Sequence, residues 1–467
     1  MKRKWIASSG LVMLGLIGLL WLAQVFSGLS VPVQILNYDP RPPGETMVRL
    51  QLETTGESLP ILIDRYLFAD QHDGSWQDDS YRSQNLGEVT AYWQYQQLIP
   101  NRSATLERVV IPSRTEPIAD RPGWNRLVLS FEPYGSELVA EYQGHELQPL
   151  TTLLANGVWR KPRGDSIAEV PFRSSPASAN TPLFDQAGPA SAPAAFDGRW
   201  RVRFGDSDEP AVGVFQVGKH SGNTFGTFLT TTGDYRYLGG RVDGDLMRLS
   251  TFDGAHAFLF HARMQVDGTI AGDFWSGNWH HETWTAVRDA DAALPDAFGQ
   301  TTATGVGLEE LAFRDLEGVP TRVVELLDAG GAPARVLYLF GSWCPNCADA
   351  GAEMKRLKGK YGDKLTVVGL AFELTEDFER SARQVGLYLE RHEADWPVLI
   401  AGLSDKAKAS AEFPVLDRVR AYPTTIFLDA DNQIVAVHTG FSGPATGEAY
   451  REQQKAFEGV VEGLIGP

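Results

Sequence analysis

The chain has 467 residues, 43% of them hydrophobic and 10% aromatic, which excludes a wholly disordered protein. Its 42 lysine and arginine residues against 59 aspartate and glutamate residues give a formal charge of −17. Because phosphate backbones attract basic surfaces, this balance argues against nucleic acid as a partner. The length predicts about three domains.

The N-terminus has the pattern of an export signal. Lys2, Arg3 and Lys4 precede an uncharged apolar stretch, and its residues 6–26 approach the roughly 20 residues with which a helix crosses a bilayer. We predict a signal-anchor or transmembrane segment over residues 1–30, with cleavage and secretion as the alternative. Positive ends stay in the cytoplasm, so everything after residue 30 is expected outside it.

Two β-rich segments are predicted next. Residues 31–173 alternate apolar and polar side chains, which indicates half-buried strands in a β-rich domain. Residues 174–196 are rich in serine, alanine and proline and predict a linker. Residues 197–288 carry short strand-like runs between glycine turns such as Asp243-Gly244, a pattern typical of a small barrel or sandwich.

Histidine and tryptophan gather in the second β-rich segment, at His256, His261, His280, His281, Trp275, Trp279 and Trp284. One interpretation is a metal site, and the ordinary one is surface histidines beside an aromatic core. Adjacent histidines in a strand point to opposite faces and no thiol lies nearby, so we predict no metal. A binding role for an aromatic face stays open.

A polar linker over residues 289–306 precedes the last segment, residues 307–467. Strand-like runs at 336–340, 365–372, 397–400 and 424–428 alternate with helix-like runs, which indicates an α/β sheet. A further strand at 433–438 follows a turn and makes one edge antiparallel. The predicted fold class is therefore a multi-domain chain with an N-terminal membrane helix, two all-β domains and a C-terminal α/β domain.

Cys344 and Cys347 are the two cysteines of the chain and lie between a predicted strand and a predicted helix. A helix N-terminus favours a thiolate, so Cys344 is predicted to attack a disulfide and Cys347 to resolve the mixed disulfide. Pro345 suits the first helical turn, where its missing N–H costs nothing. A zinc site would need four ligands and finds two sulfurs.

From about residue 311 to the C-terminus the chain resembles a thioredoxin-like domain of the TlpA/ResA type, exported and membrane-tethered thiol–disulfide oxidoreductases. The motifs that match are W-C-P-N-C, residues 343–347, and Y-P-T-T, residues 422–425. Large multi-domain bacterial relatives also place β-domains before this module and share a phrase like residues 440–447. The resemblance implies a cis Pro423 beside the cysteines and a Tyr422 backbone that pairs with the substrate. The active-site support it implies further comprises Trp343, Pro345 and Asn346.

The resemblance also implies a location and an activity. The expected protein is an extracytoplasmic disulfide reductase at the bacterial inner membrane, single-pass, with the bulk of the chain in the periplasm. Its expected partners are protein disulfide substrates and a membrane thiol donor of the DsbD/CcdA kind, with cytochrome c maturation among the possible pathways. No cofactor is implied.

The chain departs from this family where an acid or base is expected. Tyr338 stands at the position of thioredoxin's buried aspartate, and Ala350, beside Asp349, stands where many ResA-like reductases have glutamate. We predict Glu373, at the end of a strand, as the substitute. A solvated carboxylate opening the next helix is the alternative interpretation of Glu373.

Three other functions remain as alternatives. A Sco-like Cu(I) assembly factor would need a third ligand, for which His438 is the candidate, although those proteins use C-x-x-x-C. A peroxiredoxin-like peroxidase would want threonine or serine where Gly341 stands. A binding scaffold would use the β-domains to capture partners, with the cysteine pair secondary.

Overall fold

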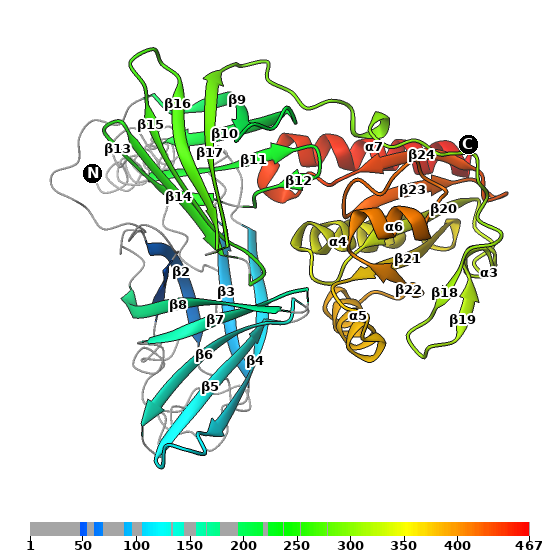
Figure 1. Ribbon diagram of the computed structural model, residues 1–467. Coiled ribbons are helices and arrows are strands. Elements are labelled where there is room, and N and C mark those ends of the chain that lie inside the picture. The colour runs from blue at the N-terminus through cyan, green and yellow to red at the C-terminus, as the bar shows by residue number, and fades with distance from the viewer. Residues whose placement is uncertain are drawn as a thin grey trace, which may run out of the picture.

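The computed structural model describes residues 47–53, 60–68, 88–95, 105–131, 134–143, 156–164, 166–177, 195–217, 223–236, 238–252, 254–277 and 279–466. Two β units come first along the chain, and an α/β unit follows them (Figure 1). The elements that carry chemistry lie where the second β unit meets the α/β unit.

The first β unit is a closed barrel whose strands pair in chain order. Its strands are β1 (Met47–Glu53), β2 (Pro60–Phe68), β3 (Glu88–Tyr95), β4 (Thr105–Pro117), β5 (Trp124–Phe131), β6 (Ser136–Gln143), β7 (Asn156–Arg163) and β8 (Ser166–Ala177). The barrel closes because β1 pairs antiparallel with both β2 and β8. Trp159 is fully buried in it.

The second β unit comprises β9 (Gly198–Phe204), β10 (Ala211–Val217), β11 (Asn223–Thr230), β12 (Gly233–Asp234), β13 (Leu238–Asp243), β14 (Leu246–Phe252), β15 (Ala257–Met264), β16 (Ile270–Ser276) and β17 (His280–Arg288). Since β10 pairs with both β9 and β11, this sheet also closes into a ring, which we call the second barrel. Alternating apolar side chains fill it with aromatic rings, among them Trp200, Phe228 and Trp284. The short β12 pairs antiparallel with the end of β11 and lies outside the ring.

The α/β unit is built on one sheet of order β19-β18-β22-β21-β20-β23-β24. Its elements are β18 (Ala312–Arg314), β19 (Pro320–Arg322), α3 (Val323–Ala329), β20 (Ala334–Phe340), α4 (Pro345–Tyr361), β21 (Leu365–Glu373), α5 (Phe378–His392), β22 (Val398–Leu403), α6 (Lys406–Glu412), β23 (Thr424–Leu428), β24 (Ile434–Thr439) and α7 (Glu448–Ile465), with short 3-10 turns at Ala297–Gly299, Gly362–Lys364 and Pro444–Thr446. The central strands β20, β21 and β22 are parallel, and β23 and β24 add antiparallel at one edge. Every residue of β20 and β21 is buried, because helices cover the sheet.

The fold class predicted from the sequence, with a membrane helix before two all-β domains and an α/β domain, is wrong. Closed β-sheets dominate the first half of the described chain. Local alternation of apolar residues indicates strands, but it does not show that the two edge strands of a sheet pair with each other. The expected membrane helix at residues 1–30 lies outside the described residues. Within the described ranges, no helix combines the length and the apolar character that crossing a membrane requires.

Candidate active site

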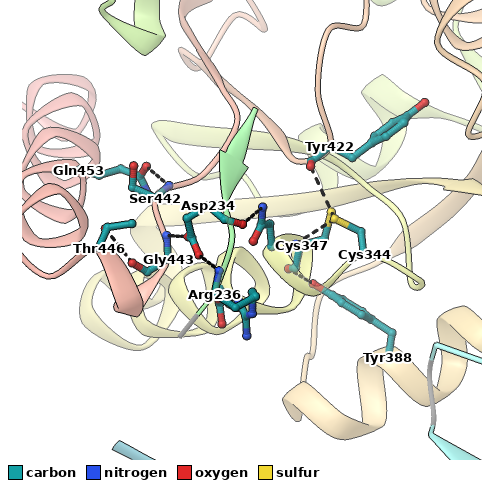
Figure 2. Close-up of polar contacts among 12 residues, drawn as sticks. Asp234, Arg236, Cys344, Cys347, Tyr388, Tyr422, Ser442, Gly443, Thr446 and Gln453 are labelled. Carbon is teal, nitrogen blue, oxygen red and sulfur yellow. Dashed lines mark hydrogen bonds and ion pairs between the residues drawn. The ribbon is translucent and has the colours of Figure 1, made fainter. Parts of the chain in front are cut away.

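The cysteine pair lies where β20 ends and α4 begins. Cys344 caps the helix, and its Sγ accepts a hydrogen bond from the Cys347 N–H at 3.3 Å. Pro345 occupies the first turn. Cys344 is 7% exposed and Cys347 is fully buried. The outer thiol is therefore the one that a substrate can reach, and the inner thiol lies one helical turn behind it (Figure 2).

The Tyr422–Pro423 segment lies against the outer thiol. Its peptide bond is cis, as the family resemblance implies, and the Cys344 Sγ–H donates to the Tyr422 carbonyl at 3.5 Å. The segment leads directly into β23, which pairs antiparallel with β20. This pairing brings residue 422 beside residue 344, although 78 positions separate them in the chain.

Two tyrosines hold the inner cysteine. The hydroxyls of Tyr338 and Tyr388 donate to the Cys347 carbonyl at 2.5 and 2.8 Å, and they lie 3.1 Å from one another. Burial raises the pKa of both hydroxyls well above the usual range, so both remain neutral donors. Burial, and then the hydrogen bond with Cys344, raises the pKa of Cys347 well above its ordinary value. The inner sulfur is thus kept as a thiol.

Glu373 ends β21 beside the motif, and its side chain is 3% exposed. Its carboxylate accepts hydrogen bonds from the Ser342 N–H at 2.9 Å and the Ser342 hydroxyl at 2.8 Å. Within the described residues, no hydrogen bond joins it to either sulfur. Burial raises its pKa to about 7, against the lowering effect of the two bonds from Ser342. Glu373 therefore fixes the turn that precedes Cys344, and proton transfer by it stays a prediction.

The predicted support residues lie around the outer thiol. The Trp343 indole N–H donates to the Phe372 carbonyl at 2.9 Å, and its ring meets Tyr422 edge-on at 6.0 Å between centroids. The Asn346 amide reaches out of the α/β unit and donates to the Asp234 carbonyl in the second barrel at 3.4 Å. Sequence reasoning assigned no such inter-unit contact to Asn346.

A short barrel segment, Thr231–Arg236, docks on the motif and is called here the barrel loop. Arg236 forms an ion pair with Asp349 of α4, and these side chains are only 6% and 15% exposed. Asp234 accepts a 2.6 Å hydrogen bond from the Gly443 N–H (Figure 2). Gly440 has φ 77°, and a side chain there would strike the backbone of Thr232. The loop after β24 thus approaches the barrel closely enough to be fixed to it.

A cavity of about 480 Å³ lies between the second barrel and the cysteine motif. From the α/β unit it is lined by residues of the motif, α6 and the loop before Pro423, including Cys344, Lys406 and Tyr422. From the β units it is lined by the barrel loop, aromatic residues and Arg163 of β7. Cys344 therefore opens into a cleft whose walls come from distant parts of the chain.

Of the histidines considered as metal ligands, His256 and His280 line the same cavity as Cys344. His438 is buried against Phe298 and Phe457, and its Nδ1 lies 3.1 Å from the Gly440 carbonyl. Burial lowers its pKa to about 4. In the barrel, His280 and His281 pair with different carboxylates. Across the part of the chain that the structure describes, no three His, Cys, Asp or Glu side chains are grouped to hold a metal.

Comparison with known proteins supports a thioredoxin-like assignment for part of the chain. No protein-family model matches. The thioredoxin-like protein YneN of Bacillus subtilis is 32% identical over 115 residues, which are 25% of this chain and 61% of that relative. This chain thus spans less than two thirds of the relative's length.

Solved structures that resemble the chain cover about a third of it. A secreted disulfide oxidoreductase of Mycobacterium tuberculosis, homologous to DsbE of E. coli, is 19% identical and matches 32% of this chain and 92% of its own, with a TM-score of 0.23. A putative thiol:disulfide interchange protein DsbE from Chlorobium tepidum is 18% identical and matches 35% and 97%, with a TM-score of 0.26. The peroxidoxin BcpB of M. tuberculosis is 18% identical and matches 34% and 96%, with a TM-score of 0.24. Part of this chain is thus similar to a thioredoxin-like protein, and its own cysteine pair stands at the strand–helix junction beside a cis-proline.

Proposed function

We propose that this protein is a thiol–disulfide oxidoreductase in which Cys344 is the nucleophile and Cys347 the resolving thiol. The observation that carries the proposal is the placement of the two sulfurs. Cys344 faces a cavity at a helix N-terminus beside the Tyr422 carbonyl, and Cys347 is buried one turn behind it. A nucleophile that is reachable and a resolving thiol that is shielded give an ordered two-step exchange.

In the first step the Cys344 thiolate attacks one sulfur of the substrate disulfide. The substrate S–S bond breaks, one thiol leaves with a proton, and a mixed disulfide joins Cys344 to the other half. Cys347 then loses its proton and attacks the Cys344 sulfur, which releases the second thiol. Two electrons have passed to the substrate, and the protein holds a Cys344–Cys347 disulfide.

We extend this proposal to a direction and a location, which rest on the family resemblance and on the predicted N-terminal segment. The protein would work outside the cytoplasm as a reductase of protein disulfides, and a membrane thiol donor would return it to the dithiol form. This direction rests on the family resemblance, since the enzymes that the C-terminal segment resembles are kept reduced by a membrane thiol donor. Glu373, with a pKa of about 7, is the proposed proton acceptor through Ser342 or solvent.

Single-turnover stoichiometry tests the proposal. The reduced full-length chain, mixed with excess 2-hydroxyethyl disulfide, is expected to release two thiols per chain and to lose both of its own. A parallel reaction with hydrogen peroxide separates the peroxidase alternative. Fast oxidation by peroxide together with no reaction with the disulfide would overturn the proposal.

A further inference from the structure

The small exposed surface of Cys344 limits what can reach it. The second barrel and the loop before Pro423 face each other across the cavity, and the outer thiol is only 7% exposed. The cavity volume of about 480 Å³ is in the range of pockets that hold small ligands. A small molecule or an extended chain can approach a sulfur with so little exposed surface more readily than a disulfide on a rigid protein surface can.

The barrel wall of this cavity is held in place by several contacts. The Arg236–Asp349 ion pair is buried, and separating it would leave an uncompensated charge in a buried place. The Asp234 side chain also accepts a hydrogen bond from the Gly443 N–H (Figure 2). The Asp234 carbonyl accepts one from the side chain of Asn346, two residues after Cys344. At the far side, Arg420 pairs with both carboxylate oxygens of Glu209 at 2.6 Å. These contacts fix the barrel wall next to Cys344, so the wall is part of the site.

Cations dominate the charged lining of the cavity. Lys406 and Arg163 both line it, and no ion pair joins either of them to a carboxylate among the described residues. The carboxylate of the lining, Asp234, is already engaged by the backbone N–H groups of Arg236 and Gly443. Two positive side chains are thus available beside an S–S exchange site.

The two cations are also placed to act on a bound substrate. Lys406, the first residue of α6, lines the same cavity as Cys344. Arg163 lies over the Trp279 ring with its guanidinium carbon 5.1 Å from the centroid. Trp279 lines the same cavity, so this stacking orients the guanidinium along the cavity wall.

We infer that this cavity is the substrate-binding site and that it selects disulfides of small cross-section that carry carboxylate groups beside the S–S bond. This inference rests on the proposed function and names its substrate class. Lys406 and Arg163 bind the carboxylates, the aromatic wall packs on the carbon skeleton, and Cys344 attacks the sulfur. The same chemistry is offered by a free dicarboxylate disulfide and by an acidic segment of an unfolded chain.

Three symmetric disulfides of similar size and different charge test the selection. The reduced full-length chain is mixed with 3,3′-dithiodipropionate, 2-hydroxyethyl disulfide or cystamine, which carry two negative charges, none and two positive charges. The rate of Trp343 fluorescence change is divided by the rate of free 2-mercaptoethanol with the same disulfide. The corrected rate is expected to be at least about tenfold higher for the dianion than for the dication.

Variants separate this inference from the proposed function. In Lys406→Gln/Arg163→Gln the dianion-to-dication ratio is expected to fall to near one. The control Lys408→Gln, an exposed residue of the same helix outside the cavity lining, is expected to keep the full ratio. An unchanged ratio in the double variant would overturn the inference. A chain that reacts with none of the three disulfides would instead overturn the proposed function.

A size series completes the test and distinguishes the two sources. A disulfide that links two short acidic peptides is expected to react within about tenfold of the small dianion if unfolded chains are substrates. Its failure to react would assign the site to free small molecules. Equal rates for that peptide and for a rigid folded protein with a surface disulfide would overturn the limit on cross-section.

Discussion

Replacing Cys344 by serine is expected to lower the rate of disulfide exchange by at least about a thousandfold, because it removes the sulfur that faces the cavity. A serine hydroxyl is not ionised at neutral pH and does not form a stable bond with sulfur. The fully buried Cys347 cannot replace Cys344, since burial also raises its pKa well above the usual range. The measurement is the single-turnover rate with 2-hydroxyethyl disulfide.

The matched variant Cys347→Ser is expected to behave differently. Cys344 would still attack, so one thiol per chain is released at a rate close to that of the wild type. The reaction then stops at a mixed disulfide, which intact-mass spectrometry detects as one added half-disulfide. If Cys347→Ser loses the first step and Cys344→Ser keeps it, the assigned roles are reversed.

Glu373→Gln is expected to remove a loss of stability that the wild type shows as the pH rises. The carboxyl has a pKa of about 7 in the folded chain against an ordinary value of 4.5, because it is buried. The folded chain therefore keeps a proton that the unfolded chain has already released, and the associated stability is full below about pH 4.5 and lost through about pH 7. Between about pH 5 and pH 8 the wild type should lose about 2–3 kcal/mol more than the variant.

Urea unfolding followed by the helical circular dichroism signal measures this effect. The α-helices among the described residues all belong to the α/β unit, so the signal reports the unit that contains Glu373. Glu376→Gln, at an exposed position three residues away, serves as the control and is expected to follow the wild type. Parallel pH profiles for the wild type and Glu373→Gln would show that the pKa of Glu373 is the same in the folded and the unfolded chain, which would contradict this prediction.

The sequence predicts the elements of the α/β unit well, because each leaves a local signal. The apolar run before the cysteines is β20, and the strand predicted at residues 424–428 is observed at those bounds. Closure of the two barrels has no such signal. It depends on pairs such as Leu50 with Ser174, which are far apart in the chain. The same local patterns fit open sheets and closed ones.

The sequence likewise identifies the site residues that lie in local motifs and misses those that reach the site from distant parts of the chain. The spacing of the cysteines and the Tyr-Pro pair identify one wall of the cavity from the sequence. Tyr388 and Asp234 leave no comparable signal, because they reach the motif from 41 residues after Cys347 and from 112 residues before Asn346. Glu373 was found by its position at a strand end, and only the structure shows that Ser342 occupies its carboxylate. Packing between units, rather than local preference, brings these residues together.

The equilibrium reduction potential of the Cys344–Cys347 pair in the full-length chain tests the central claim most directly. Trp343 lies next to the pair, so its fluorescence in dithiothreitol and glutathione buffers serves as the readout, with thiol trapping as the check. The account predicts a reversible two-electron transition near or below about −270 mV, as a reductase fed by a membrane thiol donor requires. A potential near about −120 mV would contradict the reductase direction, and the absence of any reversible transition would contradict the proposed function itself.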